Sequence, residues 1–158
     1  MVLQVASLVD SKPFPTLFWL VNPQLNLAID KLEAAGLIAQ MQEKLDAKEA
    51  YQQQLADAHR AHIQLRSHLM TDDDHRRVRQ FGFEQVFKER GIGGIKSFNR
   101  IRCLHTYYAA HLVSPNLIGQ WEFTRISATI LPPRRKKAFY ARSENWAWTG
   151  RLELLKHT

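Results

Sequence analysis

Two apolar stretches open the chain, and a short polar segment separates them. Residues 2–9 and 14–21 are rich in apolar, β-branched and aromatic side chains, whereas residues 10–13 read Asp-Ser-Lys-Pro. Such runs on either side of a turn-forming segment are typical of strands. The pattern therefore predicts a hairpin at the start of the chain.

The next segments show the spacing of helices. Asn22 is placed to cap a helix that begins at Pro23, where the missing N–H of proline costs nothing, and Gly36 is placed to end it. Residues 37–70 contain no Gly or Pro and are rich in Ala, Gln, Glu, Lys and Leu. They predict one long amphipathic helix, either continuous or broken near Asp46.

Three more elements follow the long polar helix. Thr71 and the acidic residues behind it predict the start of a helix that reaches residue 90. Residues 96–113 predict another helix, which Ser-Pro-Asn at 114–116 stops. Residues 121–131 alternate loosely between apolar and polar positions and predict a late strand.

These elements predict an α+β fold: a small N-terminal hairpin or sheet packed on three to four helices. The length of 158 residues and a hydrophobic fraction of 45% suit a single domain with a buried core. We expect that domain to occupy residues 1–131. Residues 132–158 form a tail in which basic residues alternate with aromatic ones, a composition that suits either single-stranded nucleic acid or docking on the core.

Charge and cysteine content narrow the classes of partner. The formal net charge of +7 favours anionic partners such as RNA or phosphorylated metabolites. One cysteine excludes an internal disulfide framework, and no apolar run approaches the roughly 18 to 20 residues that span a bilayer. The first residues lack the basic start of a signal peptide. We therefore expect a cytoplasmic protein without membrane contact.

A glycine loop followed by cations is the first candidate site. Glycines let backbone N–H groups approach an anion, and a following helix would add its positive dipole end. The competing interpretation is a tight turn in which the glycines serve close packing. The residues assigned to anion binding are Gly91, Gly93, Gly94, Lys96, Arg100 and Arg102.

The single cysteine and its neighbouring histidine are the second candidate. Cys103 and His105 are candidates for a nucleophile and a general base, or for a packed thiol and a hydrogen-bonded core histidine. On a continuous helix these two side chains point about 160° apart, and His111 lies two turns beyond. That geometry predicts no metal site, and no cofactor is expected. His59 and His62 are expected on the polar surface of the long helix.

Four short motifs carry a family resemblance. Residues 13–20 (PFPTLFWL), 31–36 (KLEAAG), 102–105 (RCLH) and 116–120 (NLIGQ) are similar to the signature of the bacterial domain-of-unknown-function family five-hundred-and-one. The resemblance covers about Val2 to Trp121 and implies no established activity. Members usually carry an Arg-, Gly- and Pro-rich stretch before Val2, which implies an N-terminally shortened domain. They often carry Cys-Pro where this chain has Asn22-Pro23, so a role that needs a second cysteine lacks it here.

Three functions remain open on these grounds. We rank first a non-enzymatic adaptor that binds an anion, either a phosphate-bearing ligand or RNA, at the glycine loop. The second is an enzyme that uses Cys103 or His105 beside that loop. The third is a protein-interaction module that acts through the long helix. Family members are often encoded near enolase, a coiled-coil division protein and exopolyphosphatase, so the resemblance implies a division partner or a polyphosphate-related ligand.

Overall fold

The N-terminal hairpin is present and is paired at both ends. In the computed structural model, which describes residues 2–130, β1 (Val2–Gln4) runs antiparallel to β4 (Phe18–Leu20) with Val2 opposite Leu20. Nearer the turn, β2 (Leu8–Val9) pairs with β3 (Lys12–Pro13). The predicted hairpin is confirmed, while the basic tail lies outside the described residues.

Helices make up most of the remaining described chain. The predicted start signals are confirmed at two of them: the Asn22 side chain accepts a hydrogen bond from Leu25 N, and Thr71 and Asp74 form a reciprocal capping box. Gly36 lies just beyond the first helix with a left-handed φ of 80°. The helices are α1 (Pro23–Ala34), α2 (Leu37–Asp46), α3 (Glu49–Leu69), α4 (Asp72–Gln80), α5 (Glu84–Glu89), the 3₁₀ turn η1 (Ile92–Gly94), α6 (Leu104–His111) and α7 (Leu117–Ile130).

Two predicted helices are each divided. Of the two alternatives for residues 37–70, the broken one is correct, because α2 ends at Asp46 and α3 begins at Glu49. The helix predicted to reach residue 90 is interrupted at Gly82, which has a φ of 71°. A left-handed residue cannot continue an α-helix, so the chain turns there before α5.

The predictions for residues 96–103 and 121–130 are wrong. The helix expected from residue 96 begins only at Leu104, and Cys103 has an extended backbone. The expected late strand is the second half of α7. Ser-Pro-Asn ends one helix and also begins the next, because Asn116 Oδ1 accepts a hydrogen bond from Gly119 N at 2.8 Å.

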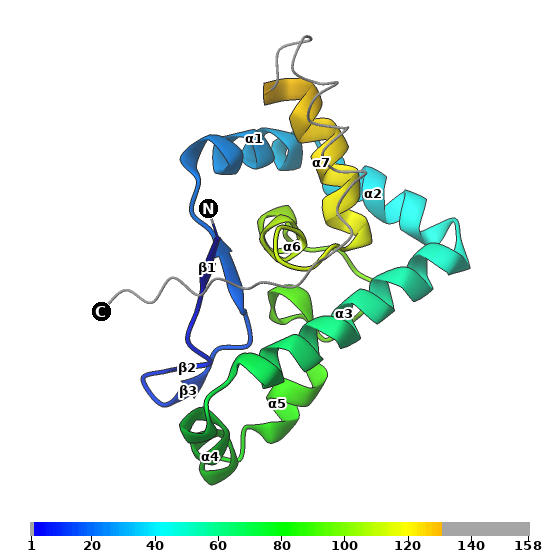
Figure 1. Cartoon of the computed structure of the whole chain (residues 1–158). Helices are drawn as coiled ribbons and strands as arrows, with labels where there is room; N and C mark the ends of the chain where they lie inside the picture. Colours follow the sequence, from blue (N-terminus) through cyan, green and yellow to red (C-terminus); the bar gives the residue numbers. More distant parts are fainter. Residues whose placement is uncertain (1, 131–158) are drawn as a thin grey trace, which may run out of the picture.

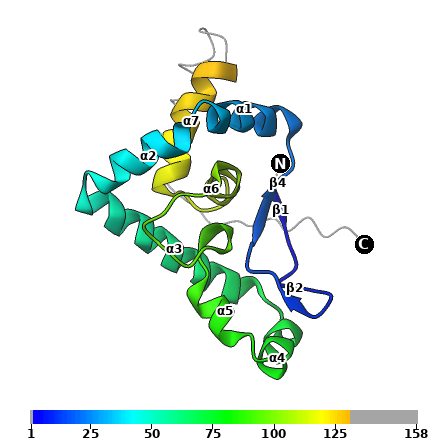
Figure 2. The same cartoon turned by 180° about the vertical axis from the view of Figure 1, so that it is seen from behind.

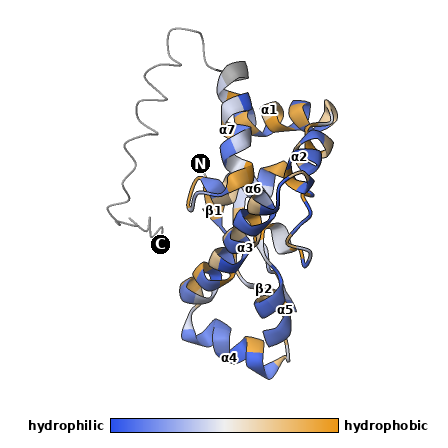
Figure 3. Cartoon of the chain, turned by 90° about the vertical axis from the view of Figure 1, so that its right-hand side faces the viewer, coloured by the Kyte–Doolittle hydropathy of each residue, from blue (hydrophilic) through white to orange (hydrophobic). Residues whose placement is uncertain are grey.

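Helix α6 lies at the centre of the molecule. Figures 1 and 2 show it enclosed by the β1–β4 ladder, α1, α7, α3 and η1. Its residues Leu104, Tyr107 and Ala109 are almost fully buried. A smaller apolar cluster of Leu8, Val78 and Phe87 joins the hairpin turn to α4 and α5. Helix α4 is mostly hydrophilic (Figure 3).

Within residues 2–130, no helix combines the length and apolar character that crossing a membrane requires.

Candidate functional site

The glycine loop and its cations border a cavity of about 440 Å³. Lys96, Arg100 and Arg102 all contribute to its wall, and so does Arg90. Lys96 Nζ lies 2.8 Å from Glu89 Oε2, and this hydrogen bond lowers the pKa of the Glu89 carboxyl. The remaining lining residues are Ile92, Gly93, Gly94, Ile95, Ser97, Cys103, Thr106 and Tyr107. We call this the basic cavity.

The backbone N–H groups of the loop are largely committed inside the protein. Gly91 N donates to Ile95 O, Gly94 N donates to Gly91 O, and Ile92 N donates to the ring of His59. In addition, the cations lie before α6 rather than in its first turns. Any anion in the basic cavity would therefore be held by side-chain cations more than by a glycine nest or a helix dipole.

His59 explains why the loop needs glycine. A Cβ placed on Gly91 would lie 2.3 Å from His59 Nδ1, so only a residue without a side chain fits there. His59 is fully buried, stacks on Phe98 at 4.7 Å between ring centroids, and lies 3.2 Å from the hydroxyl of Tyr107. The surface position expected for His59 and His62 is wrong. Burial lowers the pKa of His59 to about 4 and that of His62 to about 3, with the charge of Arg66 adding to the latter.

Arg66 fixes the same loop from the other side. Its guanidinium donates to Pro15 O at 2.7 Å, to Arg90 O at 2.6 Å and to Phe87 O, and the side chain is only 1% exposed. Burial lowers its pKa to about 10. Arg66 thus ties the hairpin to α5 and to the entrance of the glycine loop.

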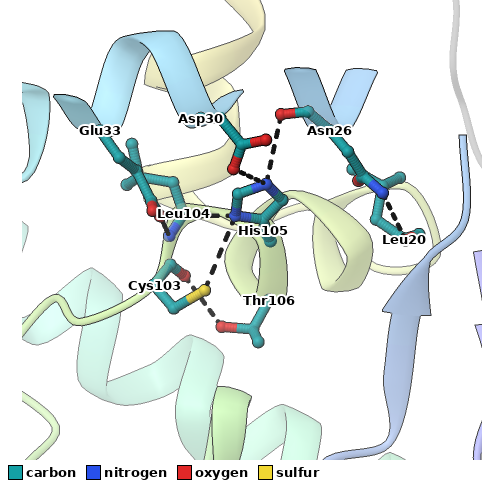
Figure 4. A network of polar contacts seen from close by, with 8 residues as sticks. All are labelled: Leu20, Asn26, Asp30, Glu33, Cys103, Leu104, His105 and Thr106. Carbon is teal, nitrogen blue, oxygen red and sulfur yellow. Dashed lines mark hydrogen bonds and ion pairs between the residues drawn. The ribbon is translucent and has the colours of Figure 1, made fainter. Parts of the chain in front are cut away.

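A second group of polar side chains gathers where α1 meets the start of α6 (Figure 4). Cys103 Sγ lies 3.9 Å from His105 Nδ1, and Glu33 Oε1 lies 3.5 Å from the same nitrogen. Glu33 Oε1 also accepts a hydrogen bond from Leu104 N at 2.7 Å, so it caps α6. We call Cys103, His105 and Glu33 the thiol cluster.

The opposite edge of the His105 ring faces further acceptors. His105 Nε2 lies 3.3 Å from Asp30 Oδ1 and 3.3 Å from the carbonyl oxygen of Asn26. Figure 4 shows Asp30 and Asn26 on one edge of the ring and Cys103 and Glu33 on the other. Burial raises the pKa of the Cys103 thiol, and the Glu33 carboxylate contributes in the same direction.

Sequence reasoning found part of these sites. It placed Cys103 and His105 on opposite faces of a helix, whereas the extended backbone at Cys103 brings their side chains together. It missed Glu33 and Asp30, which lie on α1 about 70 residues earlier and carry no local signal. His111 stays apart from the thiol cluster, since its Nδ1 accepts from Asn116 N at 3.1 Å.

Comparison with known proteins identifies the family. The family model for a protein of unknown function, DUF501, matches residues 1–124, so the chain belongs to this family. No curated protein and no solved structure matches the chain.

Proposed function

We propose that this DUF501 member is a non-enzymatic protein that binds a phosphate-bearing ligand in the basic cavity. The observation that carries the proposal is the position of Arg90, Lys96, Arg100 and Arg102 around one hollow of about 440 Å³. Guanidinium groups form paired, charge-assisted hydrogen bonds with phosphate oxygens, and such bonds are about twice as strong as neutral ones. The net charge of +7 would draw an anion toward the cavity from a distance.

The size of the basic cavity favours a small ligand over RNA. Pockets for small molecules usually have volumes of roughly 300 to 1,000 Å³. Recognition of single-stranded RNA instead depends on aromatic rings exposed for base stacking. Among the described residues, Tyr107 is the one aromatic residue in this wall, and it is 1% exposed and bonded through its hydroxyl to Arg100 O.

The enzyme alternative receives less support. A catalytic cysteine needs a thiolate near neutral pH, which a lowered pKa provides. The pKa of Cys103 is shifted in the opposite direction by burial and by Glu33. The geometry thus supplies a thiol and an imidazole in contact, but burial and the Glu33 carboxylate both disfavour the thiolate.

The interaction-module alternative is limited by how α3 packs. Leu55, His59, His62 and Arg66 are buried along one face of the helix, so this face is part of the core. Only the outer face of α3 is open to a partner, and it carries the charged residues Asp57 and Arg60 as an exposed ion pair.

The proposal can be tested by calorimetric titration with tripolyphosphate, ATP and a short single-stranded RNA. We expect the double variant Arg100→Gln, Arg102→Gln to bind tripolyphosphate or ATP about tenfold more weakly or worse, because two charge-assisted contacts are lost. The matched control is Arg60→Gln, Arg76→Gln, which removes the same charge from exposed positions on α3 and α4.

Equal loss of affinity in the cavity variant and in the control would contradict the proposal, because it would show a diffuse surface attraction. Absence of binding to any phosphate compound at low salt would contradict it as well. Tight RNA binding that both variants weaken equally would also contradict the proposal, because the positive charge would then serve nucleic-acid binding across the surface rather than a ligand in the cavity.

A further inference from the structure

We infer that the thiol cluster is a binding site for a zinc-type divalent cation, with Cys103 Sγ, His105 Nδ1 and a Glu33 carboxylate oxygen as ligands. Within the described residues, these three atoms lie within 4.8 Å of one another. The inference does not depend on the basic cavity or on its ligand.

The spacing of the donor atoms suits a tetrahedral ion. Zinc–sulfur bonds of about 2.3 Å and zinc–nitrogen or zinc–oxygen bonds of about 2.0 to 2.2 Å set distances between ligand atoms of about 3.3 to 3.6 Å. The corresponding distances here are 3.9 Å from Cys103 Sγ to His105 Nδ1 and 3.5 Å from that nitrogen to Glu33 Oε1. Small side-chain rotations would close the difference.

The outer edge of the His105 ring has the partners of a metal-bound histidine. A ligating imidazole usually donates its second N–H to a carboxylate or a backbone carbonyl, which fixes the ring and the tautomer. His105 Nε2 lies 3.3 Å from both Asp30 Oδ1 and Asn26 O. These acceptors favour a hydrogen on Nε2, so the lone pair of Nδ1 is directed toward Cys103 and Glu33.

That lone pair faces a carboxylate, and a positive charge between the two would remove the repulsion. A soft-to-borderline divalent cation at this position would also bind the Cys103 thiolate directly, since Cys103 Sγ lies 3.9 Å from the same nitrogen. The donor set of one sulfur, one nitrogen and one oxygen suits zinc better than magnesium or calcium.

Three protein ligands would leave one position of a tetrahedral ion for water or another ligand. Cys103 also contributes to the wall of the basic cavity. The metal site and the cavity would therefore share one side chain, although each can be tested without the other.

Cobalt(II) is the most direct probe, because a thiolate bound to it gives a near-ultraviolet charge-transfer band and tetrahedral coordination gives strong visible bands. We expect the metal-free wild-type chain to bind one equivalent of Co²⁺ with both signals, and Zn²⁺ to displace it. Cys103→Ser should abolish the charge-transfer band, and His105→Gln should lower Zn²⁺ affinity by at least about a hundredfold. Asp30→Asn, which changes only the outer partner of the ring, should lower it by about tenfold.

His68→Gln is the matched control, because His68 lies on the exposed face of α3 and the substitution is the same. Zn²⁺ should also protect the single cysteine of the wild-type chain from alkylation, a measurement that needs no variant. The inference is overturned if the wild-type chain shows no charge-transfer band and no protection, or if His68→Gln lowers affinity as much as His105→Gln.

Discussion

The buried pair His59 and Arg66 and the thiol cluster both join polar groups from distant parts of the chain. They differ in how many of those groups already have hydrogen-bond partners. His59 engages both ring nitrogens, Arg66 donates to three carbonyl oxygens, and both side chains are almost fully buried. The thiol cluster is only partly buried, and two potential anions face one imidazole nitrogen. Hydrogen-bonded groups such as those of His59 and Arg66 mark a structural network, whereas the partly used ligand atoms of the thiol cluster mark a place where something else can bind.

Replacing Arg66 should have the largest effect. Arg66→Met keeps much of the apolar volume but leaves Pro15 O, Phe87 O and Arg90 O without this donor. We expect a loss of about 3 kcal/mol or more in the free energy of unfolding, measured by urea denaturation. Arg60→Met on the exposed side of α3 is the control and should cost no more than about 0.5 kcal/mol. If Arg66→Met and Arg60→Met lost similar unfolding free energy, the assignment of Arg66 to a structural network would be wrong.

Acidification should weaken the structural network. The pKa of His59 falls from 6.5 to about 4 on folding, so the unfolded chain binds the extra proton first as the pH falls below 6.5. Between pH 7 and pH 5 this costs about 2 kcal/mol of unfolding free energy for His59, and His62 acts in the same direction. Below about pH 4 the contribution of His59 to this loss stops growing, because His59 is then protonated in the folded chain as well.

Glu122 opposes this trend and allows a sharper measurement. Its carboxyl is fully buried and has no hydrogen-bond partner among residues 2–130, and burial raises its pKa well above the usual value. Glu122 therefore destabilises the fold as the pH rises above the pKa that this carboxyl has in the unfolded chain. In Glu122→Gln, urea denaturation should show a larger loss between pH 7 and pH 5 than in the wild type. Equal stability at both pH values in this variant would contradict the assignment of His59 and His62 as buried neutral bases.

Gly91→Ala should produce an intermediate effect through His59. The new methyl group overlaps the ring, at 2.3 Å from Nδ1, so one of the two must move. We expect a loss of about 2 kcal/mol in the wild-type background. In a His59→Ala background the same substitution should cost clearly less, because the overlap is relieved. Additive losses in this double-mutant cycle would show that the contact between loop and ring is not the reason for glycine.

Cys103→Ser should have the smallest effect on stability. The side chain is half-buried at the edge of the core, and serine preserves its shape, so we expect a metal-free change within about 1 kcal/mol. The raised pKa of the thiol should also make wild-type alkylation at pH 7 slower than in the urea-unfolded chain. Labelling that is faster in the folded chain would indicate an activated cysteine and would restore the enzyme alternative.

The sequence was sufficient where structure is decided locally. The cap at Asn22, the capping box at Thr71 and the turn at Gly36 depend on residues within four positions of one another, and all three are found. The hairpin depends on a short turn between two apolar runs and is found as well.

Long-range hydrogen bonds explain the main errors. Nothing in residues 96–103 forbids a helix, but the Gln42 side chain accepts from Ile101 N and donates to Asn99 O, contacts that stabilise a non-helical path for this segment. The partners of His59 lie 33 and 48 positions away, so its burial has no local signal. Glu33 was missed as a member of the thiol cluster for the same reason, because it contacts the start of α6 from 71 positions away.

Helix α6 begins where Glu33 accepts from Leu104 N, a contact between residues 71 positions apart. During synthesis α1 leaves the ribosome long before α6 exists, so the thiol cluster cannot assemble until most of the domain has emerged. Closing so long a loop carries an entropic cost that only the packed core repays. Metal binding at the thiol cluster would therefore occur only after the domain has folded, and a stalled or truncated chain would remain unable to bind the ion.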